Sequence, residues 1–78
     1  MKTTRYFDAT RLRPVRVAIH DAWIQFVMDH PVKEVVQSDG RLRRWARIAD
    51  AGGRFLRVVL LEDGETVHNA FFDRGFMP

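Results

Sequence analysis

Arginine and tryptophan side chains alternate with other residues along one short segment of the chain. Its odd-numbered positions hold Arg41, Arg43, Trp45 and Arg47. A guanidinium group pairs with a phosphate through two parallel hydrogen bonds, and an indole offers a plane on which a nucleobase can stack. All but two of the 13 Lys and Arg residues are arginine. The pattern favours a phosphate-bearing partner such as RNA. The alternative is a solvated sheet face, in which arginine stems cover apolar atoms and Trp45 belongs to a second small core.

His68 is the side chain best suited to proton transfer, because imidazole titrates near neutral pH. It lies in the last predicted strand, and Arg57 is expected one strand away. A nearby guanidinium lowers the pKa of an imidazole and favours its neutral, base form. His68 and Arg57 are therefore candidate catalytic residues. The alternative is a half-buried histidine bonded to the backbone.

Arg74 is the third candidate catalytic residue, because it follows the last strand and could reach the phosphate-facing side with Asp73 as its orienting partner. The alternative is a surface ion pair, which contributes little to stability. No metal or cofactor is expected. Cysteine is absent, and His20 and His30 lack the spacing of metal ligands.

The hydrophobic period of the first half of the chain predicts one helix. It starts after Pro14, between residues 17 and 20, and ends at Pro31, because the residue before a proline avoids the α region. One face is polar, with Asp21, Gln25 and Asp29. The opposite, apolar face is expected to contain Ile19, Ala22, Trp23, Phe26, Val27 and His30.

The second half predicts four strands, over residues 33–38, 41–48, 54–62 and 65–72. Asp39-Gly40 and Asp63-Gly64 are hairpin signals. Residues 3–7 also have the composition of a strand, over too short a length to decide. The predicted fold class is α+β, with one main helix packed on a four-stranded antiparallel β-meander.

A two-residue turn at Asp63-Gly64 would place Val59 opposite His68 and Arg57 opposite Ala70. The helix-covered face would then hold Leu56, Val58, Leu60, Val67 and Phe71. The open face would hold Phe55, Arg57, Val59, Leu61, Thr66, His68, Ala70 and Phe72. Arg44 falls on the helix side, so it must either extend to the edge or lie beside a bulge.

Length and composition limit the architecture. A chain of 78 residues and 9.1 kDa is expected to form a single domain over residues 1–78. No apolar run is long enough for a membrane span, and the first ten residues contain no apolar signal core. We therefore expect a cytoplasmic protein. A metabolic enzyme is the least favoured class, because so short a chain encloses a substrate pocket only at a dimer interface.

The order of elements and the basic sheet face resemble the RelE/ParE-like, barnase-related toxin fold. The chain also resembles a group of small bacterial proteins with no assigned activity, over roughly residues 5–76. That second likeness is carried by Gln37-Ser38-Asp39-Gly40-Arg41, Trp45, Leu56-Arg57-Val58-Val59, Asp63-Gly64 and His68-Asn69-Ala70-Phe71-Phe72-Asp73-Arg74.

The toxin resemblance implies RNA cleavage without metal, by attack of a 2′-hydroxyl on its own phosphate. In those roles Arg41, Arg43, Arg47 and Arg57 would bind phosphates, and His68 or Arg74 would assist proton transfer. An antitoxin protein would be the partner. RelE-like toxins usually have two N-terminal helices and more lysine than this chain, and the ParE-like branch acts on gyrase instead of RNA.

The alternative function is a non-catalytic interaction module or homodimer. Its binding element would be the exposed strand edge at residues 33–38, which could pair with a partner strand or with a second copy. Phe55, Leu61 and Phe72 on the open face would then anchor the interface.

Overall fold

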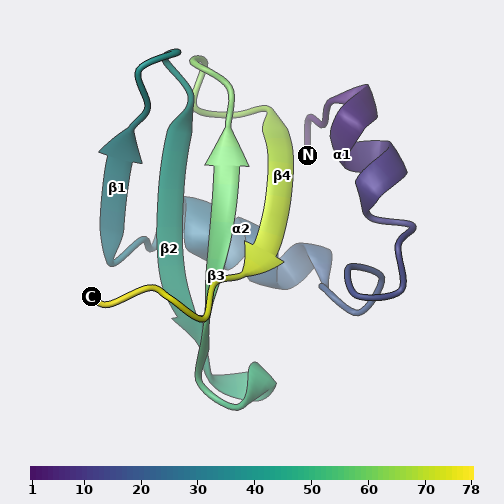
Figure 1. The fold of residues 1–78 in the computed structure, drawn as a ribbon, viewed down its shortest axis with the longest axis vertical. Coiled ribbons are helices and arrows are strands. Elements are labelled where there is room, and N and C mark those ends of the chain that lie inside the picture. Colours follow the sequence, from purple (N-terminus) through teal and green to yellow (C-terminus); the bar gives the residue numbers. More distant parts are fainter.

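A computed structural model describes all residues from 1 to 78 and has the α+β class expected from the sequence (Figure 1). The helices are α1 (Arg5–Thr10) and α2 (Asp21–Asp29). The strands are β1 (Lys33–Val36), β2 (Leu42–Ile48), β3 (Arg54–Leu60) and β4 (Val67–Phe72), and a short 3-10 helix, η1 (Ala49–Ala51), connects β2 to β3. The strands form one antiparallel sheet in chain order. None of the helices has the length and apolar character that a membrane crossing needs.

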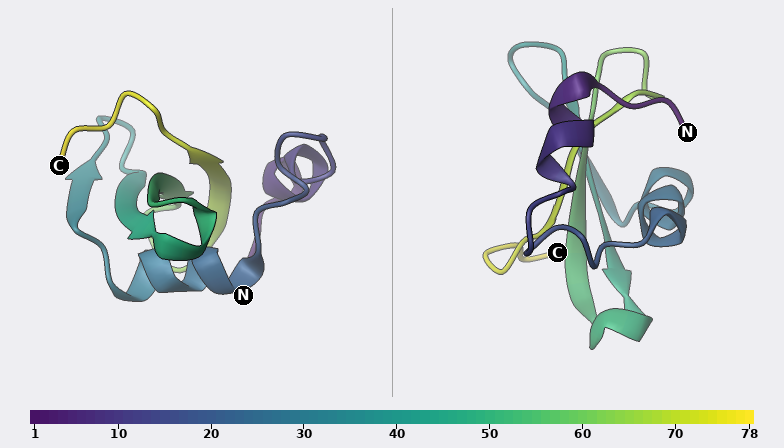
Figure 2. Two further views of the ribbon diagram at one scale, coloured as in Figure 1. Left: turned by 90° about the horizontal axis from the view of Figure 1, so that it is seen from below. Right: turned by 90° about the vertical axis from the view of Figure 1, so that its right-hand side faces the viewer.

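The sheet has two different faces. Helix α2 crosses one face, and the C-terminal segment runs across the other, as the views from below and from the right-hand side show (Figure 2). Helix α1 lies beside β4, at the edge of the sheet away from β1 (Figure 1). The helix-covered face therefore forms the main core, and the opposite face is available for a site.

The N-terminal segment corrects the expectation of a single main helix. Of residues 3–7, which have a strand-like composition, only Thr3 forms a β-bridge, an isolated parallel one with Val67, beside which Thr4 N donates to Val67 O at 3.0 Å. Helix α1 starts directly afterwards, because the Thr4 hydroxyl accepts from Phe7 N at 3.1 Å and caps it. The protein thus has two short helices ahead of the sheet.

Helix α2 ends where Pro31 predicts, with His30 as its C-cap, but the expected apolar face is only partly buried, with Ile19 and Val27 in the core as predicted. Ile24 and Val27 are buried, whereas Ala22, Phe26 and His30 are exposed. The apolar face predicted from the sequence did not include Ile24, which follows Trp23 and points at the sheet. The main core also includes Phe7 and Ile19 on the helical side and Ala46, Ile48, Leu56, Val58, Leu60, Val67 and Ala70 on the sheet side.

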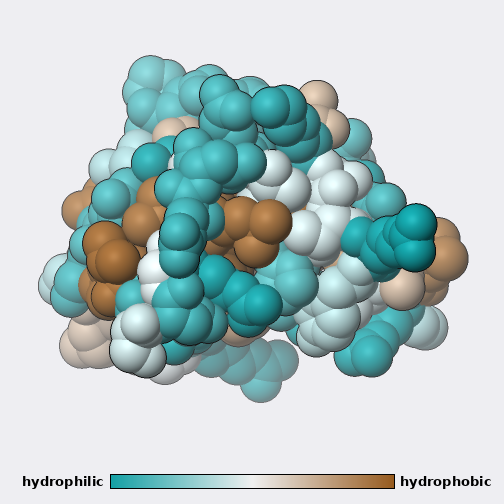
Figure 3. Space-filling model, turned by 90° about the horizontal axis from the view of Figure 1, so that it is seen from above, coloured by the Kyte–Doolittle hydropathy of each residue, from teal (hydrophilic) through white to brown (hydrophobic).

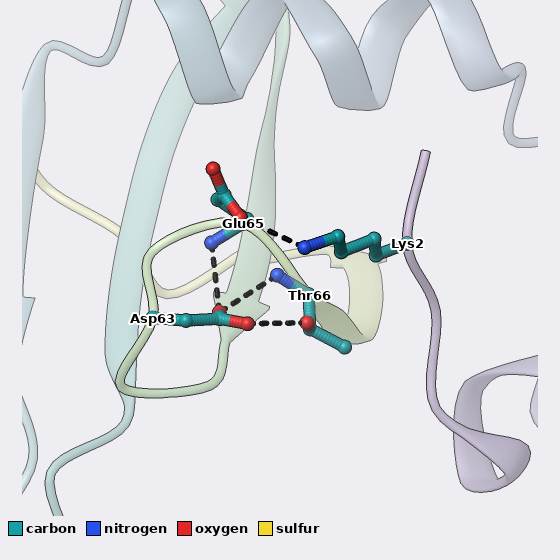
Figure 4. A network of polar contacts seen from close by, with 4 residues as sticks. All are labelled: Lys2, Asp63, Glu65 and Thr66. Atoms are coloured by element: carbon teal, nitrogen blue, oxygen red, sulfur yellow. Dashed lines mark hydrogen bonds and ion pairs between the residues drawn. The ribbon is translucent and has the colours of Figure 1, made fainter.

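The hairpin between β3 and β4 is wider than a two-residue turn. Leu61 N donates to Thr66 O at 2.9 Å, and the loop between them is held by Asp63. The Asp63 carboxylate accepts from Glu65 N and Thr66 N at 2.9 Å and from the Thr66 hydroxyl at 2.6 Å (Figure 4). These bonds lower the pKa of Asp63 to about 2, with the Thr66 hydroxyl as the largest cause. No residue other than glycine has a positive φ, so Asp63 cannot supply the first position of a type I′ turn.

A bulge in β4 changes the predicted register. Leu60 pairs with Val67 as expected, but Val59 then pairs with Asn69 and Arg57 with Phe71. His68 is the extra residue between these pairs. Beyond it, each side chain of β4 changes face relative to the prediction. Ala70 and Phe72 therefore join the helix side, and Phe71 lies on the open face.

Arg44 reaches the edge of the sheet, which is the first of the two predicted solutions. Strand β2 keeps a regular register with β3, and Arg44 pairs with Val58 on the helix side. Its guanidinium donates to Glu34 Oε2 at 2.6 Å and to Met28 O at 3.1 Å. The positive charge thus lies at the C-terminal end of α2, where it is favoured by the helix dipole.

Candidate phosphate-binding groove

The open face of the sheet is hollowed near the start of β4. The hollow has a volume of about 430 Å³ and is open to solvent. Its lining residues come from α1, from the β1–β2 connection and from β3 and β4: Tyr6, Gln37, Arg41, Arg57, Val59, His68, Asn69 and Phe71. The end of the molecule that carries the two hairpin turns shows mostly hydrophilic side chains, with smaller apolar areas among them (Figure 3). We refer to this hollow as the groove.

Strand pairing brings two predicted arginines together. Arg43 pairs with Val59, and Trp45 pairs with Arg57, so Arg43 and Arg57 are diagonal neighbours on adjacent strands. The positive charge of Arg43 lowers the pKa of Arg57, although burial is the larger cause and Asp73 acts in the opposite direction. Two guanidinium groups this close favour an anion between or beside them.

Arg57 is the most constrained cation of the groove. Its side chain is only 22% exposed and pairs with Asp73 at 3.6 Å. The guanidinium lies over the rings of Phe71, at 5.0 Å, and Trp45, at 5.7 Å. Arg57 Nε is buried and has no hydrogen-bond partner. An unsatisfied buried donor is costly, so the position of Arg57 is held by its contacts with Asp73, Phe71 and Trp45 at the expense of this hydrogen bond.

Arg41 and Arg43 are positioned by the turn before β2. Arg41 pairs with Asp39 at 3.6 Å. With its amide oxygen turned toward Arg43, Gln37 accepts from Arg43 Nη2 at 2.8 Å and Nε at 3.2 Å. Both arginines keep part of their surface exposed. They can therefore exchange weak partners for a phosphate without unfolding the turn.

The bulge and helix α1 together hold His68. Its Nδ1 lies 3.0 Å from the Thr4 hydroxyl, and its ring stacks on Tyr6 at 4.8 Å between centroids. Burial lowers the pKa of His68, the charge of Arg41 lowers it further, and Asp39 opposes the shift. The imidazole is therefore mainly neutral at pH 7, as a general base requires.

Several residues in the groove or in contact with its lining could not be recognised from local sequence. Arg16 belongs to the connection between α1 and α2, yet its Nη1 donates to Asn69 Oδ1 at 2.7 Å and its guanidinium lies over Phe71. Tyr6 and Gln37 also come from segments outside β2, β3 and β4. Among these additional residues, only Asn69 carried a signal in the local sequence, because it is adjacent to the candidate catalytic residue His68.

Trp45 lies on the open face, as its strand position predicts, but it is covered. It is 6% exposed. Phe76 stacks on its ring at 4.8 Å with an interplanar angle of 15°, and Trp45 Nε1 donates to Asp73 Oδ2 at 3.0 Å. With Phe55, which also contacts Phe76, these rings form the second small apolar cluster that was the alternative interpretation.

Arg47 and Arg74 are not part of the groove. Arg47 Nε donates to Gly53 O at 3.2 Å, and its side chain borders a separate hollow beside α2. Arg74 lies two residues beyond the end of β4, whereas His68 is near the beginning of that strand; the stretch from His68 to Phe72 alone spans about 13 Å at the usual rise per residue. Asp73, the predicted partner of Arg74, instead pairs with Arg57.

Histidine and carboxylate side chains do not gather into a group of three or more that could hold a metal ion. Comparisons with protein-family models, with curated proteins and with solved structures found no match to this chain. The geometry of the groove is therefore the basis for a functional proposal.

Proposed function

We propose that this chain is a cytoplasmic RNA-binding protein of the RelE/ParE-like toxin type, which cleaves RNA in the groove without a metal ion. The observation that carries the proposal is that Arg41, Arg57 and a neutral His68 line one groove, with Arg43 beside Arg57 on the adjacent strand. Three guanidinium groups supply both the affinity for phosphate and the positive charge that a pentacoordinate phosphate needs. The two helices ahead of the meander are also compatible with the toxin resemblance.

The proposed reaction uses the nitrogen of His68 that faces away from Thr4. When Nδ1–H donates to the Thr4 hydroxyl, Nε2 carries a free lone pair. Nε2 accepts the proton of a ribose 2′-hydroxyl, and the 2′-oxygen forms a bond to the adjacent phosphorus. The bond from phosphorus to the 5′-oxygen breaks, and water protonates that oxygen. The products are a 2′,3′-cyclic phosphate and a free 5′-hydroxyl.

The interaction-module alternative has less support. Strand β1 is at the edge of the sheet and pairs with a strand on one side only, and Val36 in this strand is exposed. Of the three expected anchors, however, Phe72 packs on the helix side and Phe55 lies against Phe76. An antitoxin protein remains the partner that the proposed function implies.

The proposal predicts salt-dependent binding of RNA. Three phosphate contacts to a single-stranded oligonucleotide give a slope of log affinity against log salt of about −2. Arg41→Ala should reduce the size of that slope by about 0.7, because one contact is lost. Fluorescence anisotropy of a labelled oligouridylate at several potassium chloride concentrations measures both slopes.

Arg13→Ala is the matched control, because it removes an equal charge from an exposed position in the connection between the helices. It should leave the slope nearly unchanged. Equal effects of Arg13→Ala and Arg41→Ala would show that only net charge matters. A wild-type dimer in sedimentation, without salt-dependent RNA binding, would favour the interaction module.

A further inference from the structure

The C-terminal segment is attached to the sheet at one point and covers it beyond that point. Asp73 N donates to Phe55 O at 2.9 Å, so the backbone of Asp73 extends the pairing of β3. After it, Gly75 N donates to Asp73 Oδ1 at 3.2 Å and Phe76 N to Asp73 O at 3.3 Å. These bonds are local. The segment 74–78, which we call the cover, therefore makes no hydrogen bond to the open face of the sheet that it crosses (Figure 1).

Phe76 provides the main contact of the cover with the open face. Its ring stacks almost parallel on Trp45 and lies 5.0 Å from the ring of Phe55. A nucleobase on a tryptophan adopts the same kind of stacked arrangement. Phe76 thus occupies the position that a base would take on this indole.

The indole beneath Phe76 is already oriented for such a ligand. Asp73 Oδ2 accepts from Trp45 Nε1 at 3.0 Å, and this bond fixes the plane of the ring. Trp45 is the cross-strand partner of Arg57, which lines the groove. A base on Trp45 and a phosphate at Arg57 would therefore be neighbours, as they are within one nucleotide. Arg74, exposed on the cover, adds a positive charge close by.

We propose that the cover is displaceable and that one nucleobase of the RNA stacks on Trp45 in place of Phe76. This inference rests on the proposed function, because the phosphate of the same strand lies in the groove. The intact chain then binds RNA less tightly than a chain whose cover cannot stack. An aromatic pair of this kind accounts for a factor of about 2 to 10 in affinity.

The chain contains two tryptophans, Trp23 and Trp45. The experiment uses Trp23→Phe as the background, because Trp45 is then the only tryptophan that remains. Phe76→Ala in this background should bind a short oligouridylate about 2- to 10-fold more tightly. RNA should also quench Trp45 fluorescence more strongly in Phe76→Ala than in the background protein. Adding Trp45→Phe should remove the gain in affinity.

Met77→Ala is the matched control, because Met77 belongs to the same segment and is 82% exposed. It should change neither affinity nor quenching. Phe76→Leu is the second variant, since leucine keeps an apolar cover but cannot stack; it should show a gain in the same direction even if Phe76→Ala does not fold.

Two results would overturn the inference in distinguishable ways. Unchanged or weaker binding by folded Phe76→Ala or Phe76→Leu, with binding still dependent on Arg41, would refute the cover and leave the proposed function standing. Absence of oligouridylate binding by every variant and by the intact chain would refute both the displaceable cover and the proposed function.

Discussion

Replacing Ile24 with alanine is expected to lower the free energy of unfolding by about 2–5 kcal/mol. Ile24 is 1% exposed and lies between α2 and the sheet, in the main core. Removing its side chain leaves a cavity that the surrounding residues fill only in part. Because small domains have few kcal/mol to spare, much of the Ile24→Ala protein should be unfolded. Urea denaturation followed by circular dichroism measures the loss.

Phe26→Ala is the matched variant, on the same helix. Phe26 is 45% exposed and its ring lies 5.3 Å from that of His30. We expect a loss of less than about 1 kcal/mol, although phenylalanine is the larger side chain. The reverse order of the two losses would show that α2 presents the face expected from the sequence, with Phe26 inside.

His68→Ala is expected to slow RNA cleavage by about 10²- to 10⁴-fold, the usual range for loss of a general base. Binding should change little, because the arginines make the phosphate contacts. The rate of the wild-type protein should rise with pH through the acidic range and level off above the pKa of His68. The reason is that burial and Arg41 hold the pKa of His68 below 6.5, and only the unprotonated form accepts a proton. Initial rates of oligonucleotide cleavage across about pH 5–8 measure the profile.

His20→Ala is the control for this variant, since His20 packs on Trp23 beside the helix, outside the groove. Its cleavage rate and pH profile should equal those of the wild type. Cleavage by His68→Ala at the wild-type rate would remove His68 from the mechanism. A wild-type rate that increases toward low pH would also contradict its role as a base.

Local signals predicted the framework of the fold. Pro31 marked the end of α2, and the glycines at positions 40 and 64 marked two of the three connections between adjacent strands. The odd positions of β2 were predicted to share a face with Arg57, and Trp45 and Arg57 are indeed cross-strand partners. These features depend on a few adjacent residues, so a single sequence is sufficient to find them.

The remaining features depend on contacts between distant parts of the chain. The bulge at His68 adds one residue to β4, and a pattern of period two cannot show where such an addition falls. Phe76 covers Trp45 because the chain turns back after Asp73. Helix α1 depends on its cap at Thr4 and on packing against β4, which override a strand-like composition. The same long-range packing brings Tyr6 to the groove and places Arg16 against Asn69 and Phe71 of its lining.

The proposed function depends on phosphate binding by the open face of the sheet at Arg41, Arg43, Arg57 and His68. An amide chemical-shift titration of the ¹⁵N-labelled protein with a short oligouridylate tests this most directly. We predict that the largest shifts occur at those four residues and at Asn69, and that they diminish as salt is added. Largest shifts on α2 and the β2–β3 connection, or none at any RNA concentration, would contradict the account.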